Sequence, residues 1–549
     1  MDSAAPFFQD PPVLANQYLD DAVLRAHLER VLPPDVLAGV EAQLDAMGEQ
    51  AAGRMLVLQD AAEANPPVHV PYDAWGRRVD AVRTDPAWPE LGRIAAVAGL
   101  TALPYEAGLG AHGRTVQMAL AYLYAPSAAT YLCPIAMTDA AARTLLEYGD
   151  PAVFGSVVSR LTSRDPEQAW TSGQWMTERE GGSDVGGTAT TAVRSGDEWR
   201  LYGTKWFTSA VTADVALTLA RPEGAGRGSR PLALFYVQLR RADGTWNGLR
   251  VNRLKDKLGT RALPTAELEL DATVAVPVGA VDDPGVPKIA TMLNLTRLHN
   301  SVAAVSGMRR GLALARAYAD VRNAFGQRLT DLPLHAETLA QIAVQTEAGF
   351  ALAFRVAELC GRAESGEASV DEVRLLRILT PLAKLFTGKQ AVSVASEVLE
   401  CFGGAGYIED TGVPRLLRDA QVLPLWEGTT NVLSLDVLRA MSRDDAVKPL
   451  VDDIGRMLVD AREIRELGEP VAVVGAAVGA LGDRLAAMGA ESDDVVAAGA
   501  RTLAFALAAT YIGALLVEAA AWAIAKRHAR AAGAIDTARR WARTMTPGV

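Results

Sequence analysis

Cysteine is scarce in this chain of 549 residues. Its three cysteines, Cys133, Cys360 and Cys401, lie far apart and lack the close spacing of a metal-binding motif. Scattered cysteines also exclude a disulfide framework and are typical of a reducing compartment. We therefore expect a cytoplasmic protein that holds no metal ion.

An excess of positive charge is absent as well. The 54 Lys and Arg residues against 65 Asp and Glu give a net charge of −11, which excludes a protein that coats nucleic acid with its whole surface. The amino terminus, MDSAAPFFQD, lacks the basic and apolar regions of a signal peptide. We therefore expect no secretion signal at this end.

Long hydrophobic runs are few, and one of them needs weighing as a membrane span. In residues 502–525 the only charged residue is Glu518, and the length would suffice to cross a bilayer. The stretch is rich in alanine rather than leucine or isoleucine, and it holds an acidic residue. We therefore interpret it as a buried bundle helix and expect no membrane contact.

The hydrophobic pattern changes along the chain, whose length predicts two to four domains. Residues 1–170 are predicted to be mostly helical after a start broken by prolines. In residues 171–284 short segments alternate apolar and polar side chains, as in the strand predicted over residues 215–219. Residues 232–237 are predicted to form a fully buried strand. Helical spacing returns in residues 285–441, where helices are predicted over 334–364 and 370–399, and it continues through the Ala-rich residues 442–549. The predicted order is helical, β, helical and a further helical region.

Two short segments at the start of the predicted β domain combine small, hydroxyl and aromatic residues. Residues 176–185, Met-Thr-Glu-Arg-Glu-Gly-Gly-Ser-Asp-Val, are predicted to form a turn in which two glycines let backbone amides approach a ligand. The hydroxyls of Thr177 and Ser183 can donate hydrogen bonds there. Residues 203–209, Gly-Thr-Lys-Trp-Phe-Thr-Ser, are predicted to lie on a strand. Taken singly, a polar turn and a strand with core aromatics are the simpler interpretations.

A third segment, residues 425–431, has the sequence Leu-Trp-Glu-Gly-Thr-Thr-Asn and contains a candidate general base. Its carboxylate, Glu427, lies between an aromatic residue and a glycine, and residues 422–425 around it are mostly apolar. Apolar surroundings make a carboxylate a stronger base. On this segment alone, a surface residue or a helix cap is the simpler interpretation of Glu427.

In this order and with this domain organisation, the three segments resemble those of the acyl-CoA dehydrogenase family. The resemblance implies a mainly α fold with a central β domain, and FAD as the cofactor of a homotetramer. It implies an N-terminal helical domain (1–170), a β-barrel-like domain (171–284), a four-helix bundle that completes the FAD site (285–441) and an extra C-terminal helical region (442–549).

The resemblance also assigns roles to individual residues. Glu427 matches the catalytic base of the family, while Thr177 and Ser183 match residues that bind the flavin ring and the pyrophosphate. Residues 322–326, Arg-Asn-Ala-Phe-Gly, resemble an element whose arginine reaches the FAD of a neighbouring subunit, and residues 400–406 resemble a glycine-rich loop on the adenine side. The expected FAD-binding residues are Met176, Thr177, Gly182, Ser183, Phe207, Thr208, Ser209, Arg322, Phe325, Gly403, Gly404, Trp426, Gly428, Thr429 and Asn431.

Other residues narrow the resemblance to the AidB-type branch of the family. They are the short segments at residues 65–67, 72–78 and 254–261, together with Trp426, which replaces a tyrosine common in the family. This branch is linked to the adaptive response to DNA alkylation, and its final helical region is associated with double-stranded DNA. Three departures from the family pattern are Arg179 for a common proline, Phe207 for a tryptophan and Glu400 for a glutamine.

The leading hypothesis is an FAD flavoprotein in which Glu427 removes a proton next to a thioester carbonyl while hydride passes to flavin N5. The substrate is a small molecule, with acyl-CoA as the candidate. One alternative is a DNA-binding protective protein of the alkylation response with a vestigial or detoxifying flavin site. Another is an FAD oxidoreductase that acts on a metabolite without CoA.

For DNA, the resemblance and the charge count disagree. Residues 442–549 hold 13 Lys and Arg against 14 Asp and Glu, but basic residues gather on the predicted final helix. They predict weak contact with double-stranded DNA that is independent of base sequence, although a solvated helix end explains the pattern equally well. The candidate DNA-binding residues are Arg527, Arg530, Arg539, Arg540 and Arg543.

Overall fold

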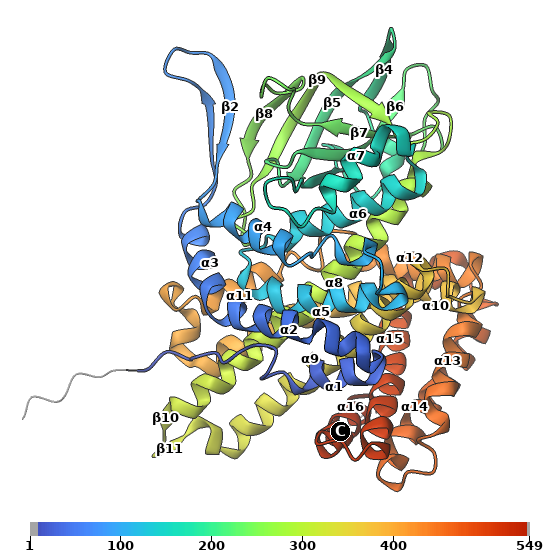
Figure 1. Cartoon of the computed structure of the whole chain (residues 1–549). Helices are drawn as coiled ribbons and strands as arrows, with labels where there is room; N and C mark the ends of the chain where they lie inside the picture. Colours follow the sequence, from blue (N-terminus) through green and yellow to red (C-terminus); the bar gives the residue numbers. More distant parts are fainter. Residues whose placement is uncertain (1–8, 546–549) are drawn as a thin grey trace, which may run out of the picture. The chain divides into compact units, whose positions relative to one another are not determined.

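The computed structural model describes residues 9–545 (Figure 1). Contacts between Cα atoms divide the chain into two compact units. The first unit, here called the helical unit, comprises Met1–Ala52 and Asn300–Val549. The second, here called the barrel unit, comprises Gly53–His299. The predicted fold, helical at both ends with a central β domain and extra C-terminal helices, is confirmed.

The amino-terminal half of the barrel unit is helical, as predicted. Its helix α5 is so enclosed that all of its twelve residues are buried. A β hairpin interrupts these helices, and the sequence analysis did not predict it. The elements are α3 (Arg54–Ala64), β1 (Val68–Tyr72), β2 (Arg78–Arg83), α4 (Ala87–Val97), α5 (Gly113–Tyr124), α6 (Leu132–Tyr148) and α7 (Pro151–Leu161).

A seven-stranded sheet forms the rest of the barrel unit (Figure 1). Its strands are β3 (Ser172–Trp175), β4 (Thr191–Ser195), β5 (Glu198–Ser209), β6 (Val215–Pro222), β7 (Ala233–Gln238), β8 (Leu249–Leu254) and β9 (Thr265–Pro277). The order is β3-β6-β4-β5-β9-β7, with β8 on β9, and β7 also pairs with β6. This last pairing closes the sheet into the predicted barrel-like form, around a core that includes Trp175, Leu201, Phe235 and Leu268.

Long helices make up the helical unit (Figure 1). The predicted helices at 334–364 and 370–399 are confirmed, and Ser369 and Glu372 form a capping box at the start of the second. The elements are α1 (Ala22–Val31), α2 (Pro34–Ala52), the later part of α8 (Gly285–Val321), β10 (Asn323–Ala324), β11 (Gln327–Arg328), α9 (Pro333–Glu364), α10 (Val370–Phe402), α11 (Val413–Ala420), α12 (Thr430–Arg443), α13 (Val447–Val459), α14 (Gly468–Met488), α15 (Asp493–Ala525) and α16 (Ala531–Met545).

Two helical stretches are long and apolar enough to cross a membrane, Arg465–Met488 and Asp493–Ala525. The most apolar part of the second is 72% buried within the protein, so the prediction of a buried bundle helix for residues 502–525 is confirmed. Its acidic residue, Glu518, pairs with Arg30 and Arg456 at 2.8 and 2.9 Å. The most apolar part of the first stretch is only 6% buried, so α14 presents an Ala- and Gly-rich surface to its surroundings.

Candidate active site

A buried ion pair anchors the loop formed by residues 176–185 to the barrel. Lys205 on β5 has no exposed surface, and its Nζ lies 2.7 Å from a carboxylate oxygen of Glu178. Glu178 also accepts hydrogen bonds from the backbone N–H of Ala189 and from the Thr190 hydroxyl. Burial alone would raise the pKa of Glu178, but the charge and hydrogen bond of Lys205 hold it below its ordinary value. Both residues lie in the quoted motifs, yet the sequence analysis assigned neither a role.

The anchored loop leaves polar groups free to meet a ligand. Within residues 9–545, the hydroxyls of Thr177 and Ser183 make no hydrogen bond, and Ser183 is exposed. Gly182 packs directly on the Thr177 side chain, where an added Cβ would collide with the hydroxyl. The residue at 182 therefore has to be glycine for the loop to keep this shape.

A β bulge explains how strand β5 presents an aromatic ring to solvent. Lys205 pairs with Leu268 and Thr208 with Ala266, so the segment between them on β5 holds one residue more than its partner. Phe207 lies in this bulge and is 55% exposed. The backbone N–H of Trp206 donates to Thr177 O at 3.0 Å, which ties the bulge to the loop.

The hydroxyls after the bulge are engaged within the barrel. Thr208 is buried, and its hydroxyl donates to Ala266 O at 2.8 Å, so only its backbone is open to a cofactor. Ser209 is half-buried, and its hydroxyl lies 3.2 Å from that of Thr265. Open hydroxyls on the loop, a glycine at close approach and an exposed ring nearby fit a flat cofactor with polar edges, as FAD is.

In the helical unit, Glu427 lies in a tight turn between α11 and α12. Its φ is +58°, a left-handed conformation that non-glycine residues rarely adopt, and the following Gly428 has φ +104°. The Thr429 hydroxyl caps the start of α12 by accepting from Val432 N. The fully buried Lys384 of α10 donates to Gly428 O at 2.6 Å. The turn therefore holds a half-buried carboxylate in one backbone conformation.

Asn300 on α8 contacts the same turn through both ends of its side-chain amide. Its Nδ2 donates to Leu423 O at 3.2 Å, and its Oδ1 accepts from Trp426 Nε1. Asn300 lies more than a hundred residues from the turn, so no local sequence pattern links the two. Lys384 lies on an apolar helix, and its sequence neighbours give no sign that it binds a backbone carbonyl.

The other predicted cofactor residues of the helical unit lie on exposed turns. Phe325 is 93% exposed at the tip of the β10–β11 hairpin, beside Arg322, which donates to Gln9 Oε1 at 3.3 Å. Gly403 and Gly404 follow α10 and have open space around them. Asn431, at the start of α12, is exposed, and its Oδ1 accepts from Arg501 at 3.4 Å.

The predicted arrangement of the C-terminal arginines needs correction. Helix α15 ends at Ala525, and Arg527 has φ +50°, so Arg527 and Arg530 lie in a turn before α16 and not on the predicted final helix. Arg530 pairs with Glu347 at 2.8 Å, and Arg540 with Glu337 at 2.6 Å. Arg539 donates to Glu466 O, and Arg543 lies 3.8 Å from Glu469. Most of this positive charge therefore has a partner within the protein.

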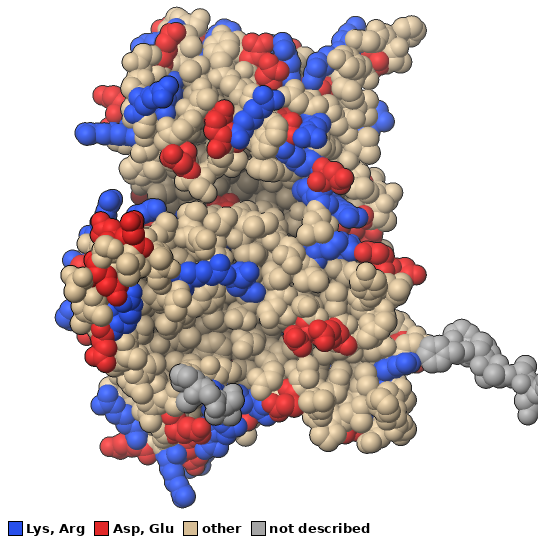
Figure 2. Space-filling model, turned by 180° about the vertical axis from the view of Figure 1, so that it is seen from behind, with Lys and Arg blue, Asp and Glu red and all other residues tan. Residues whose placement is uncertain are grey.

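The distribution of surface charge agrees with this correction. On the face seen in Figure 2, Lys and Arg side chains are interspersed with Asp and Glu, and neither sign covers a broad area of the described residues. DNA binding by this region stays a prediction.

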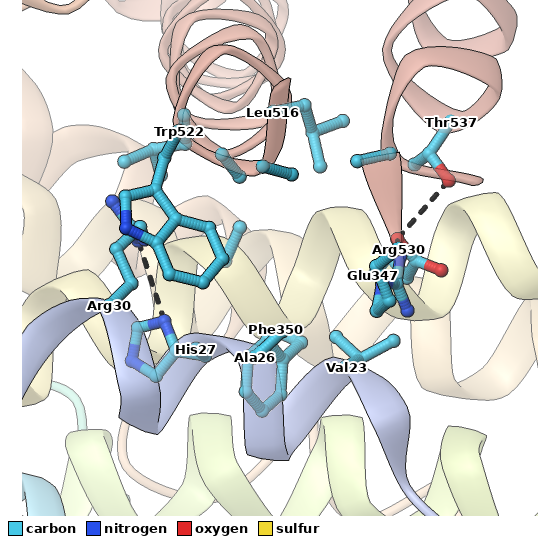
Figure 3. Close-up of a pocket in the computed structure, with 15 residues that line it drawn as sticks. Val23, Ala26, His27, Arg30, Glu347, Phe350, Leu516, Trp522, Arg530 and Thr537 are labelled. Carbon is cyan, nitrogen blue, oxygen red and sulfur yellow. Dashed lines mark hydrogen bonds and ion pairs between the residues drawn. The ribbon is translucent and has the colours of Figure 1, made fainter. Parts of the chain in front are cut away.

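A small cavity lies where α15 and α16 pack on α1 and α9 (Figure 3). Its wall is mostly apolar, with Phe350 and Leu516 between two polar ends. One end holds His27 and Arg30, and the other holds Glu347 with Arg530 and Thr537 (Figure 3). Its volume of about 60 Å³ is far below that of a coenzyme site, so the cavity belongs to the packing of the C-terminal helices.

Comparison with known proteins covers nearly the whole chain. Residues 9–168 match the adaptive response protein AidB N-terminal domain, and residues 173–273 and 283–442 match the middle and C-terminal domains of acyl-CoA dehydrogenases. Residues 445–547 match the acyl-CoA dehydrogenase 11 C-terminal domain-like family.

Individual relatives are similar over most of their length. The chain is 44% identical to acyl-CoA dehydrogenase family member 11 of Caenorhabditis elegans, over 93% of this chain and 85% of that protein. It is 34% identical to the putative acyl-CoA dehydrogenase AidB of Escherichia coli, over 80% of each chain. The crystal structure of C. elegans ACDH-11 in complex with C11-CoA superposes with a TM-score of 0.95, at 42% identity, over 99% of this chain and 93% of that one.

Proposed function

Because this chain belongs to the acyl-CoA dehydrogenase family, we propose that it is an FAD-dependent oxidoreductase that oxidises an acyl-CoA thioester, with Glu427 as the base. The observation that carries the proposal is the turn around Glu427. A carboxylate is held there in a left-handed conformation by a buried lysine and a helix cap. Such a conformation costs about 1 kcal/mol or more and is typical of functional sites.

The proposed reaction removes two hydrogens from neighbouring carbons of the acyl chain. Glu427 takes the proton from the carbon next to the thioester carbonyl, and a hydride leaves the adjacent carbon, so a double bond forms between them. Bound FAD would supply the hydride acceptor. A hydrogen bond from the Glu427 backbone amide to the thioester oxygen would stabilise the developing enolate, by roughly 3 kcal/mol in comparable oxyanion sites.

The residues that would hold FAD are those that the barrel presents openly. Thr177 and Ser183 would donate hydrogen bonds to the ring and the pyrophosphate, and Phe207 would lie over the flavin. In the helical unit, Arg322 and Phe325 sit on an exposed hairpin. We propose that this hairpin meets a second copy in a homotetramer, and light scattering should then give four times the mass of the chain.

The structure of a relative in complex with C11-CoA supports a substrate class. We propose that this chain also accepts a medium- to long-chain acyl-CoA. Undecanoyl-CoA is therefore the probe of choice. Anaerobic mixing with the purified holoenzyme should bleach the visible absorbance of the oxidised flavin.

Glu427→Gln provides the decisive comparison. The change is nearly isosteric, so the variant should retain FAD. Removal of the α-proton should fall by about a thousandfold or more, because a positioned base contributes 10²–10⁴-fold. The measurement is exchange of the α-protons of undecanoyl-CoA in D₂O, followed by mass spectrometry.

Glu409→Gln, on an exposed turn of the same unit, is the matched control and should exchange at the wild-type rate. Equal exchange in wild type and Glu427→Gln would exclude Glu427 as the base. A holoenzyme that binds FAD but is not bleached by any acyl-CoA would favour the alternative of a substrate without CoA.

A further inference from the structure

The turn that carries Glu427 is contacted at two points by one side chain of a distant helix. Asn300 on α8 is 4% exposed. Its amide N–H donates to the carbonyl of Leu423, which begins the turn, and its amide oxygen accepts from the indole N–H of Trp426, which precedes the base. One planar group therefore fixes both the backbone and the aromatic ring on the approach to Glu427.

A second set of contacts holds the other side of the turn. Lys384 donates to Gly428 O, directly after the base. Before the base, the backbone of the same helix at Gly388 packs so closely on Leu423 that an added Cβ would lie 3.1 Å from Leu423 O. Asn300 and Lys384 thus contact residues on opposite sides of Glu427. A non-glycine residue in the left-handed region costs free energy and persists only where the surrounding structure holds it there.

We propose that Asn300 is a positioning residue, which holds the Trp426 ring and the Leu423 carbonyl so that Glu427 keeps its left-handed backbone and its orientation toward the substrate. This role rests on the proposed function of Glu427 as the base. The side-chain amide of Asn300 bonds to Leu423 and Trp426, and it acts on Glu427 through these two residues.

The test compares three variants of the FAD-loaded protein with undecanoyl-CoA as the probe. Asn300→Leu removes both hydrogen bonds with little change in volume. Trp426→Phe removes only the indole donor. The double variant carries both changes, so the three form a double-mutant cycle. Thr387→Val is the matched control, because the buried Thr387 hydroxyl donates to Ala383 O of its own helix.

Asn300→Leu should lower kcat by about 10- to 100-fold with KM changed less than about threefold, because a small displacement of a reacting group costs rate rather than affinity. Trp426→Phe should lower kcat less, and the double variant should be no slower than Asn300→Leu. Thr387→Val should match wild type. An unchanged kcat in Asn300→Leu, or effects that multiply in the double variant, would overturn the proposal.

Hydrogen exchange provides a readout that needs no turnover. Peptides that cover residues 422–432 should exchange faster in Asn300→Leu and in Trp426→Phe, while the α10 peptides around Thr387 keep the wild-type rate. If wild type fails to react with any acyl-CoA, the proposed function is wrong, yet this measurement still decides whether Asn300 fixes the turn. If Asn300→Leu does not retain FAD, Trp426→Phe tests the same bond, and unchanged exchange there would refute it.

Discussion

The ion pair between Lys205 and Glu178 is buried close to the loop that presents Thr177 and Ser183. Removing water from two charges is costly, and their mutual attraction repays that cost only when the geometry and the remaining hydrogen bonds are good. Here Lys205 also donates to Leu219 O, and Glu178 accepts from two residues of the segment before β4. The pair therefore fixes the position of the loop more than it adds to stability.

Lys205→Met should lower the free energy of unfolding by about 3 kcal/mol, because it leaves a buried carboxylate without its partner. The variant should also bind FAD more weakly, since the loop loses its anchor. Thermal unfolding and flavin absorbance per chain measure the two effects. Arg200→Met, which removes an exposed pair with Glu198, should change stability by less than about 0.5 kcal/mol.

Acid should release the flavin through the same pair. The pKa of Glu178 is lower in the folded protein than its ordinary value near 4.3, so its contribution to stability is complete above that value and is lost as the pH falls through the folded pKa. We expect FAD retention to decline below about pH 4. In Glu178→Gln this part of the decline should be absent, and an identical pH profile in both proteins would contradict the assignment.

At the scale of elements, the sequence predicted those strands and helices that a local hydrophobic pattern determines. The alternation in residues 215–219 and the spacing in residues 334–364 gave strand β6 and helix α9 correctly. Phe207 was placed on a strand, but its exposure follows from a bulge, which depends on pairing with β9. Arg527 was predicted to lie on a helix. The helix ends there because Arg527 is left-handed, and the local sequence Lys-Arg-His contains no glycine or proline that would predict such a break. Asn300 could not be found, since only the fold brings it to residue 426.

The turn between α15 and α16 docks on α9 through Arg530 and Glu347. The pKa of Glu347 is raised by burial, against the opposing effect of Arg530. Arg530→Met should therefore destabilise the C-terminal helices, by about 2 kcal/mol for a pair that keeps some solvent contact. Urea unfolding measures this change.

Adding Glu347→Gln to Arg530→Met should restore part of the loss, because the unpaired charge disappears. Arg543→Met serves as the control, since Arg543 is 61% exposed and lies 3.8 Å from its partner. A loss as large in the control as in Arg530→Met would show that the effect is not specific to the buried pair.

For the whole molecule, the charge of −11 and the pairing of the C-terminal arginines act against DNA binding. We expect the protein to bind long duplex DNA weakly and only at low salt, through the few charges that remain open. Each phosphate contact contributes about −0.9 to the slope of log affinity against log salt, so a slope no steeper than about −3 is expected.

A fluorescence titration at salt concentrations between about 20 and 200 mM measures the slope. In this range, proteins that bind many phosphates typically lose about 10³-fold in affinity. The triple change of Arg539, Arg540 and Arg543 to Glu should abolish any binding. A steep slope, or binding indifferent to these substitutions, would place the DNA contact elsewhere on the protein.

Glu427 occupies a backbone conformation that glycine adopts without penalty. Selection for folded protein alone would therefore favour glycine at position 427. Selection for catalytic turnover would instead favour glutamate there. In a variant library, cellular abundance and activity should rank substitutions at position 427 in opposite orders. Opposite rankings at this position would show that Glu427 is kept for its chemistry at the expense of the fold.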